Sequence, residues 1–86
     1  MPYTVLIRRQ AQKKLRSLPR NERARLAAKI NQLRHDPDNP ALDTKALAGV
    51  PLHRLRVGDW RIIYDRQDAV RIIAIEKIKS RGDAYK

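Results

Sequence analysis

The stretch HRLRVGDWRIIY, residues 53–64, carries the side chains best suited to chemistry in this chain. Arg54, Arg56 and Arg61 lie on both sides of a Gly-Asp pair and alternate with apolar residues. A guanidinium group stays charged at physiological pH, and its planar, forked N–H donors match the oxygens of a phosphate. The three arginines therefore predict a site that binds a phosphate and stabilises negative charge.

A second basic group follows in EKIKSRGDAYK, which supplies Lys77, Lys79, Arg81 and Tyr85. An aromatic ring among cations suits RNA, because bases stack on rings while Lys and Arg hold the backbone. The alternative interpretation is a solvated tail in which Tyr85 is a packing anchor.

The net charge of +11 is concentrated at one end of the chain. Residues 1–35 contain ten basic residues and a single acid, Glu22, whereas residues 36–86 contain ten basic and eight acidic residues. Such an excess favours a polyanionic partner, either nucleic acid or an acidic protein, because neutralising phosphates releases counterions and charge steers association. A solubilising cationic face is the other interpretation.

Composition excludes several other classes. Cysteine is absent and there are only two histidines, so disulfides and thiolate or zinc sites are excluded. No apolar run is long enough for a membrane span or a signal peptide. We expect a single cytoplasmic domain over residues 1–86, without metal, cofactor or membrane contact.

The elements that must position these side chains follow from hydrophobic spacing and from turn residues. A β-branched run predicts a strand over residues 3–7, and apolar spacing predicts a helix from about Arg9 to before Pro19. A second helix is expected from about Arg20 to Asp36, with an apolar face through Ala24, Ala27, Ile30 and Leu33 and with Leu26 beside it.

The rest of the chain predicts a loop and three strands. Residues 35–43, HDPDNPALD, have the composition of a loop, and a turn follows at residues 49–51. Strands are expected over about residues 52–57, 60–66 and 70–78. The order β-α-α-β-β-β predicts an α+β fold, in which a small antiparallel-rich sheet has both N-terminal helices packed on one face.

Gly58 and Asp59 predict a two-residue hairpin loop, and this loop sets the register of the strands beside it. Cross-strand partners share a face of the sheet. The expected core pairs are Val57 with Trp60, Leu55 with Ile62 and His53 with Tyr64, and the expected pairs of the other face are Arg56 with Arg61 and Arg54 with Ile63.

Arg56 opposite Arg61 is an unfavourable pair of like charges. A phosphate bound between the two guanidinium groups would offset the repulsion. The alternative is a carboxylate from a neighbouring strand or loop, and on the third strand Glu76 is the one expected in reach.

The stretches KALAGVPLHRLRVGDWRIIYD and IIAIEKIKSRGDAYK resemble the signature of the RelE toxins of bacterial and archaeal toxin–antitoxin systems, in the RelE/ParE superfamily. The most specific pieces are LRVGDWRIIY and the ending KI, two residues, R, two residues, AY. The resemblance covers nearly the whole chain. It implies a RelE-like fold and a toxin that enters the ribosomal A site, cleaves mRNA without a metal or cofactor, and so inhibits translation.

The same resemblance implies a set of partners. They are a cognate RelB-like antitoxin encoded beside the toxin, mRNA, and the ribosomal RNA of the A site. Operator DNA is implied as a partner only of toxin and antitoxin together, which would repress their own genes. The excess cations of the two N-terminal helices are expected to contact ribosomal RNA.

Residue by residue, the resemblance assigns catalytic roles to three side chains. Arg61 matches the arginine that binds the scissile phosphate, and Arg81 matches the one that assists the leaving group. Tyr85 matches the tyrosine that stacks on or orients the substrate nucleotide. The expected RNA-binding residues are Arg54, Arg56, Lys45 and Lys79.

How the 2′-hydroxyl is activated stays open, because the chain departs from two branches of the family. One branch has lysines where this chain has Leu52 and Arg54, and another has a Glu/His pair that is absent here. Lys45 or Lys79 would serve as a base if neighbouring cations lowered its pKa. His53 has a suitable pKa, but its register places it on the core face. We favour a mechanism without a side-chain base, in which arginines stabilise charge and hold the RNA in line.

Two other function classes share these features. A ParE-like toxin would have the same fold and inhibit DNA gyrase by binding it, although that branch usually lacks the terminal arginine and tyrosine. A non-catalytic basic domain would bind any RNA in a salt-sensitive way, without cuts at defined positions.

Overall fold

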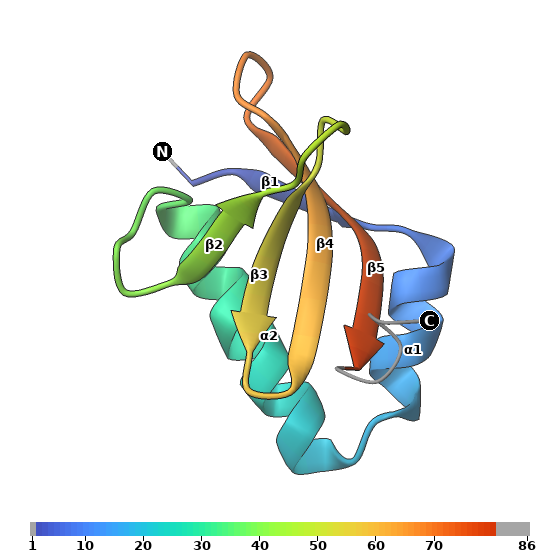
Figure 1. Ribbon diagram of the computed structural model, residues 1–86. Coiled ribbons are helices and arrows are strands. Elements are labelled where there is room, and N and C mark those ends of the chain that lie inside the picture. Colours follow the sequence, from blue (N-terminus) through green and yellow to red (C-terminus); the bar gives the residue numbers. More distant parts are fainter. Residues whose placement is uncertain (1, 81–86) are drawn as a thin grey trace.

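The computed structural model describes residues 2–80, which form an α+β fold. The elements are β1 (Thr4–Ile7), α1 (Arg9–Ser17), α2 (Arg20–His35), β2 (Asp43–Ala46), β3 (His53–Val57), β4 (Trp60–Gln67) and β5 (Ile72–Ser80). The strands make one sheet in the order β1-β5-β4-β3-β2, in which β1 runs parallel to β5 and the other pairs are antiparallel. Both helices cover the same face (Figure 1), so the expected architecture is confirmed.

The helices end where the sequence indicates, and α2 buries part of the expected face. Leu18 is extended before Pro19, as the residue before a proline prefers, and this separates α1 from α2. Leu26, Ile30 and Leu33 are the buried residues of α2. The expected face is therefore confirmed at Ile30 and Leu33 and is wrong only at Ala24 and Ala27, which are exposed. The larger side chains at i, i+4 and i+7 bury more apolar area.

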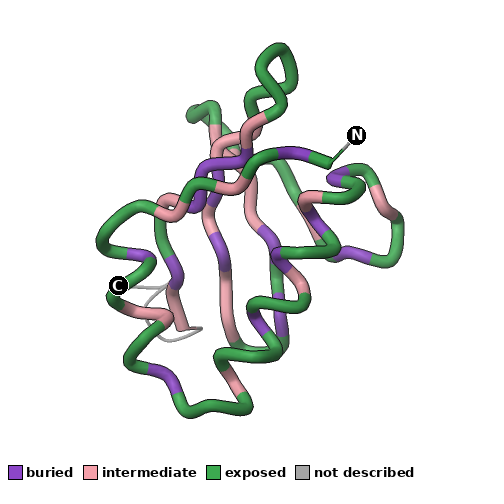
Figure 2. Tube along the Cα trace, turned by 180° about the vertical axis from the view of Figure 1, so that it is seen from behind, coloured by how far each residue is buried: buried purple, intermediate pink, exposed green. Residues whose placement is uncertain are grey.

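The core lies between the sheet and the helices, where Figure 2 shows the buried positions of the strands. Every expected hairpin pair is present, from Val57 opposite Trp60 to His53 opposite Tyr64. Leu55 and Ile62 are fully buried, and Tyr64 is 1% exposed. Burial raises the pKa of the Tyr64 phenol. The register therefore places the arginine face of the hairpin on the side away from the core.

Glu22, the single acid of residues 1–35, links this hairpin to α2. Its Oε2 accepts a hydrogen bond of 3.0 Å from Nε1 of Trp60, and Nζ of Lys14 lies 5.6 Å from the centre of the same ring. The polar edge of a half-buried indole is thus paired, and its face contacts a cation. Because Trp60 directly precedes Arg61, these contacts help fix the start of β4.

The sequence missed β2. This strand begins at Asp43, the last residue of the expected loop, and pairs with β3 so that Asp43 faces Arg56 and Lys45 faces Arg54. Three of its four residues are exposed, so it lacks the alternation of apolar and polar residues that identifies a half-buried strand. Its backbone pairing adds an edge to the sheet and brings a carboxylate beside the arginines of β3.

The last strand differs from its expected bounds for a backbone reason. Arg71 has φ of 53°, in the left-handed region, so β5 starts at Ile72 and runs to Ser80. Pairing with β4 shifts between Ile63, opposite Lys77, and Tyr64, opposite Ile75. Glu76 is the extra residue of this bulge, and such a bulge can turn a side chain toward a site.

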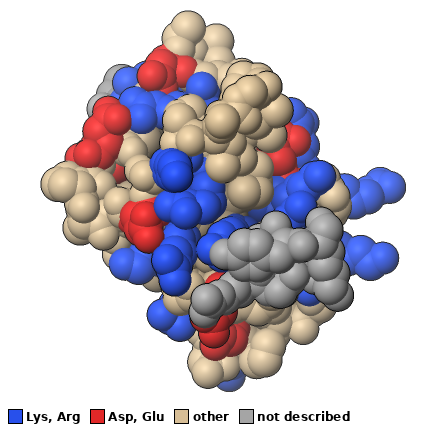
Figure 3. All heavy atoms as spheres, viewed as in Figure 1, with Lys and Arg blue, Asp and Glu red and all other residues tan. Residues whose placement is uncertain are grey.

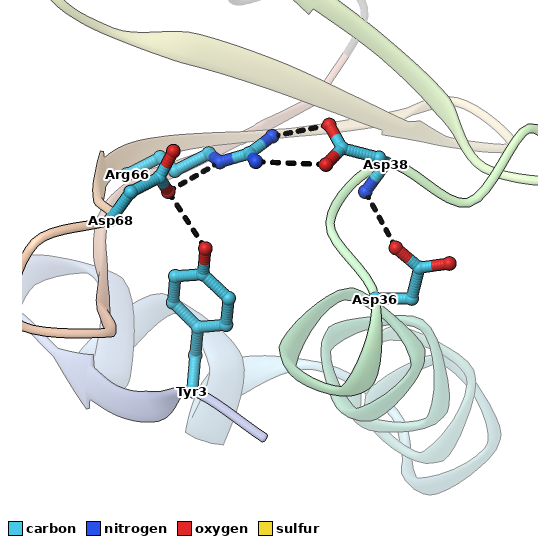
Figure 4. Close-up of polar contacts among 5 residues, drawn as sticks. All are labelled: Tyr3, Asp36, Asp38, Arg66 and Asp68. Atoms are coloured by element: carbon cyan, nitrogen blue, oxygen red, sulfur yellow. Dashed lines mark hydrogen bonds and ion pairs between the residues drawn. The ribbon is translucent and has the colours of Figure 1, made fainter. Parts of the chain in front are cut away.

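An ion-pair network joins the end of β4 and the turn after it to the α2–β2 loop and to Tyr3, the residue before β1 (Figure 4). Arg66 donates to Oδ1 of Asp68 at 2.7 Å and to both carboxylate oxygens of Asp38 at 2.7 and 3.0 Å. The Tyr3 hydroxyl donates to Asp68 at 2.8 Å. Hydrogen bonds from Arg66 hold the pKa of both carboxyls below the ordinary value of 3.8.

Arg66→Gln is expected to lower the urea midpoint of unfolding at neutral pH. A carboxyl whose pKa is lowered by folding stabilises the protein above its unfolded value of 3.8, and this stabilisation is lost as pH falls through the lower folded value. The difference in urea midpoint between Arg66→Gln and wild type should therefore shrink at pH values below 3.8. Arg23→Gln, which alters an exposed side chain without an ion pair to residues 2–80, is the matched control. A difference in urea midpoint that persists in acid would contradict the stabilisation by the ionised carboxyls of Asp38 and Asp68.

Candidate functional site

A groove of about 610 Å³ lies on the sheet face opposite the helices. Residues from β2, the β2–β3 connection, β3, β4 and β5 line it. Its charged lining residues are Lys45, Arg54, Arg61, Lys77, Lys79 and Glu76, and its apolar ones are Ala46, Leu47, Ala48, Leu52 and Ile63. In Figure 3, Lys and Arg gather over the middle of this face. The groove thus combines a cationic floor with an apolar wall.

Arg61 lies between cations on both neighbouring strands. It faces Arg56 on β3 and Lys79 on β5. Like charges placed directly opposite each other in a sheet are destabilising. An anion bound over Arg61 would offset this repulsion on both sides at once.

Arg54 is the arginine that a neighbouring carboxylate screens. Its Nη2 donates to Oδ1 of Asp43 at 3.0 Å, and the side chains of Arg54 and Asp43 are 18% and 58% exposed. A carboxylate from β2 therefore pairs with Arg54, whereas the expected carboxylate was to screen Arg56 and Arg61. Nε of Arg54 is buried and has no hydrogen-bond partner among the described residues. The guanidinium is thus oriented by Asp43.

Glu76 is the one carboxylate among the described residues that line the groove. Its Oε2 binds Nε of Arg8 at 3.2 Å, and the Glu76 side chain is 28% exposed. Arg8 follows β1 directly, so this ion pair also joins the β1–α1 junction to β5.

The groove brings together four of the expected site residues, Lys45, Arg54, Arg61 and Lys79. Arg56 shares the hairpin face with Arg61, but its exposed side chain lies outside the groove and its Nε donates to the Gly58 carbonyl at 3.5 Å. Arg56 is therefore not among the residues that line the groove, and its expected role in RNA binding stays a prediction. Arg81 and Tyr85 lie outside the described residues.

His53 is a packed residue, as its register predicts. Its ring stacks on Tyr64 with the ring centres 5.5 Å apart, and it does not line the groove. The sequence did not predict the apolar wall of the groove, although the expected register placed Ile63 on the arginine face. Leu47 and Leu52 come from a connection whose path depends on β2, and no signal in the sequence revealed β2.

Within residues 2–80, no group of three or more His, Cys, Asp or Glu side chains is arranged to hold a metal ion. Neither described helix has the length and hydropathy that crossing a bilayer requires.

Comparison with known proteins gives the family. The model of the ParE toxin of type II toxin–antitoxin systems, parDE, matches residues 5–85. The chain belongs to the RelE/ParE superfamily of toxins. No curated protein sequence is similar enough to the toxin to count as a match.

Solved structures support the same membership. A chain of the archaeal RelE–RelB complex from Pyrococcus horikoshii OT3 is 35% identical to the toxin, with a TM-score of 0.82 and coverage of 95% of this chain and 98% of that one. The RelB–RelE complex from Methanococcus jannaschii (23% identity, TM-score 0.78, 94% and 95% covered) shares the fold. The intact E. coli RelBE complex (22% identity, TM-score 0.75, 91% and 95% covered) shares it too. The toxin thus has the RelE fold of a type II toxin–antitoxin system.

Proposed function

We propose that this toxin is a metal-independent endoribonuclease, an mRNA interferase that cuts mRNA in the ribosomal A site and thereby inhibits translation. The observation that supports the proposal best is the groove, in which cations from four strands surround one surface. These cations supply fixed positive charge where a phosphorane would carry its negative charge.

The described residues take distinct parts in this proposal. Arg61, flanked by Arg56 and Lys79, binds the scissile phosphate and stabilises the charge that develops on it. Arg54, oriented by Asp43, holds a backbone phosphate beside it. Lys45 and Lys79 neutralise further phosphates at the rim, and the apolar wall offers a surface on which a base packs.

Two roles rest on the resemblance of the sequence alone. Arg81 protonates the leaving oxygen, and Tyr85 orients the substrate nucleotide. Both follow β5 in the chain, which ends at Ser80 beside the groove residue Lys79.

The partners follow the same proposal. Solved complexes of similar chains contain RelB, which supports a RelB-like antitoxin for this toxin. In the proposal the antitoxin neutralises the toxin, and the pair together binds operator DNA and represses its own genes. Free toxin acts in the cytoplasm on ribosome-bound mRNA.

Expression of the toxin with and without its antitoxin, followed by primer extension to map mRNA ends, tests whether the toxin is an mRNA interferase. Growth arrest with cuts inside translated codons would support the proposal. The match to a ParE family model favours one second candidate, a gyrase-binding toxin. Purified toxin that inhibits supercoiling and leaves ribosome-bound mRNA intact would decide for that candidate.

Glu76→Gln is expected to keep the cleavage rate within about threefold of wild type, because the favoured mechanism relies on positive charge and not on a carboxylate base. Single-turnover cleavage of ribosome-bound mRNA measures this rate. Arg8→Gln, which removes the ion-pair partner of Glu76 from outside the groove, is the companion variant. A loss of about a hundredfold in Glu76→Gln alone would instead identify the carboxylate as the base.

A further inference from the structure

A second pocket, of about 220 Å³, lies between α2 and the edge of the sheet where β2 meets β3. None of its lining residues lines the groove. Its charged members are Arg25 and Lys29 from α2, Arg56 from β3, and Asp43 from β2. This pocket is therefore a separate place on the molecule, and it contains the arginine that the groove leaves out.

The three cations of this pocket, Arg25, Lys29 and Arg56, form no ion pair with any of residues 2–80. The nearby acid, Asp43, binds Arg54 at 3.0 Å. Three positive groups around a small pocket repel one another, so an anion placed among them would be bound favourably.

The guanidinium of Arg25 lies close to the hairpin turn. A Cβ atom on Gly58 would lie 2.9 Å from Nη2 and 3.0 Å from Nη1 of Arg25, closer than van der Waals contact permits. Gly58 also has φ of +59°, which favours glycine. Lys29 follows Arg25 by four residues, so both side chains lie on the same face of α2. The glycine thus lets the β3–β4 turn and the helix bring their cations together.

We propose that this pocket binds a phosphate group of RNA, at a site apart from the groove. Two forked guanidinium groups and one ammonium match the several oxygens of a phosphate, and the small volume suits a single oxyanion. Arg56 and the groove residue Arg54 are two residues apart on one strand, about 7 Å, so one RNA can reach both sites.

The experiment measures RNA binding separately from cleavage. The probe is a fluorescein-labelled 2′-O-methyl oligoribonucleotide, which cannot be cut because the 2′-oxygen is blocked. Fluorescence anisotropy gives its affinity over a range of salt concentrations. Arg25→Gln/Lys29→Gln removes two pocket cations, and Arg20→Gln/Arg23→Gln removes two exposed cations of the same helix outside the pocket.

The Arg25→Gln/Lys29→Gln variant (the pocket pair) is expected to bind the oligonucleotide about tenfold more weakly than the Arg20→Gln/Arg23→Gln variant (the control pair). The reason is that the pocket pair loses charged hydrogen-bond donors as well as net charge. The slope of log affinity against log salt should fall by about 0.7, the value for one phosphate contact on a single strand. Inorganic phosphate should shift the amide resonance of Gly58 in wild type and not in the pocket pair. Equal losses of affinity in the pocket pair and the control pair would overturn the proposal, since they would reflect general charge attraction.

Gly58→Ala provides an independent check, because its Cβ would displace the Arg25 guanidinium. It should weaken RNA binding in the wild-type background and have little further effect once Arg25 is Gln, which a double-mutant cycle measures. Additive losses would count against the proposal. So would a pocket pair that loses affinity for a poly-glutamate peptide and not for the oligonucleotide, since this result would assign the pocket to an acidic protein segment.

Discussion

Arg61→Ala is expected to lower the single-turnover rate of mRNA cleavage on the ribosome by about 10²–10³-fold, the usual cost of removing one donor that stabilises a developing oxyanion. Arg61 lies in the groove, and its cross-strand neighbours on β3 and β5 are the cations Arg56 and Lys79. Binding of the mRNA should change much less, because Arg54, Lys45 and Lys79 still line the groove.

Arg61→Lys separates charge from geometry. It keeps the positive charge but loses the forked donors, so an intermediate rate is expected. Arg23→Ala removes an exposed arginine outside both pockets. Measured at saturating ribosome, where weaker ribosome binding does not alter the rate, it controls for the change in net charge. If Arg61→Ala and Arg23→Ala cleave at similar rates, the role proposed for Arg61 is wrong.

Ile62→Ala is expected to lower the free energy of unfolding by about 2–5 kcal/mol, because it leaves a cavity in the fully buried core. A small domain has a total stability of only about 5–15 kcal/mol, and this chain has no disulfide to add to it. Toxicity should therefore fall at growth temperature although the groove itself is unaltered. Urea denaturation monitored by the single tryptophan measures the change.

Ile63→Ala is the matched control for this prediction. It removes the same atoms from the next residue of β4, but Ile63 is only half-buried and lines the groove. The free energy of unfolding should fall by less in Ile63→Ala than in Ile62→Ala. Equal losses from the two variants would show that the two faces of β4 are not packed as described.

The sequence predicts the hairpin of the site well because local chemistry determines it. Gly58 and Asp59 impose a short turn, and once Val57 lies opposite Trp60 every later pair follows from the two-residue period of a strand. The arginine face and the stacked His53 were predicted for this reason, and the order of strands and helices followed from clear apolar spacing and from Pro19.

What the sequence did not reveal depends on contacts between distant residues. β2 is an exposed edge strand without an apolar face, so its pairing with β3 leaves no periodic signal. The bulge that places Glu76 in the groove depends on how β5 pairs with β4. The division of Arg54 and Arg56 between two pockets depends on where β2 begins and on α2 beneath it.

The pairing of β1 with β5 has a consequence for when this toxin becomes active. Thr4 pairs with Ile72, and β5 lies between β1 and β4, so the strand made first joins the sheet only through the strand made last. Contacts between residues so far apart in the chain form late and slowly. A growing chain on the ribosome cannot complete the sheet before residues up to Ser80 have emerged. The order of synthesis thus delays completion of the sheet, and of the groove that β5 helps to line, until translation has passed this strand.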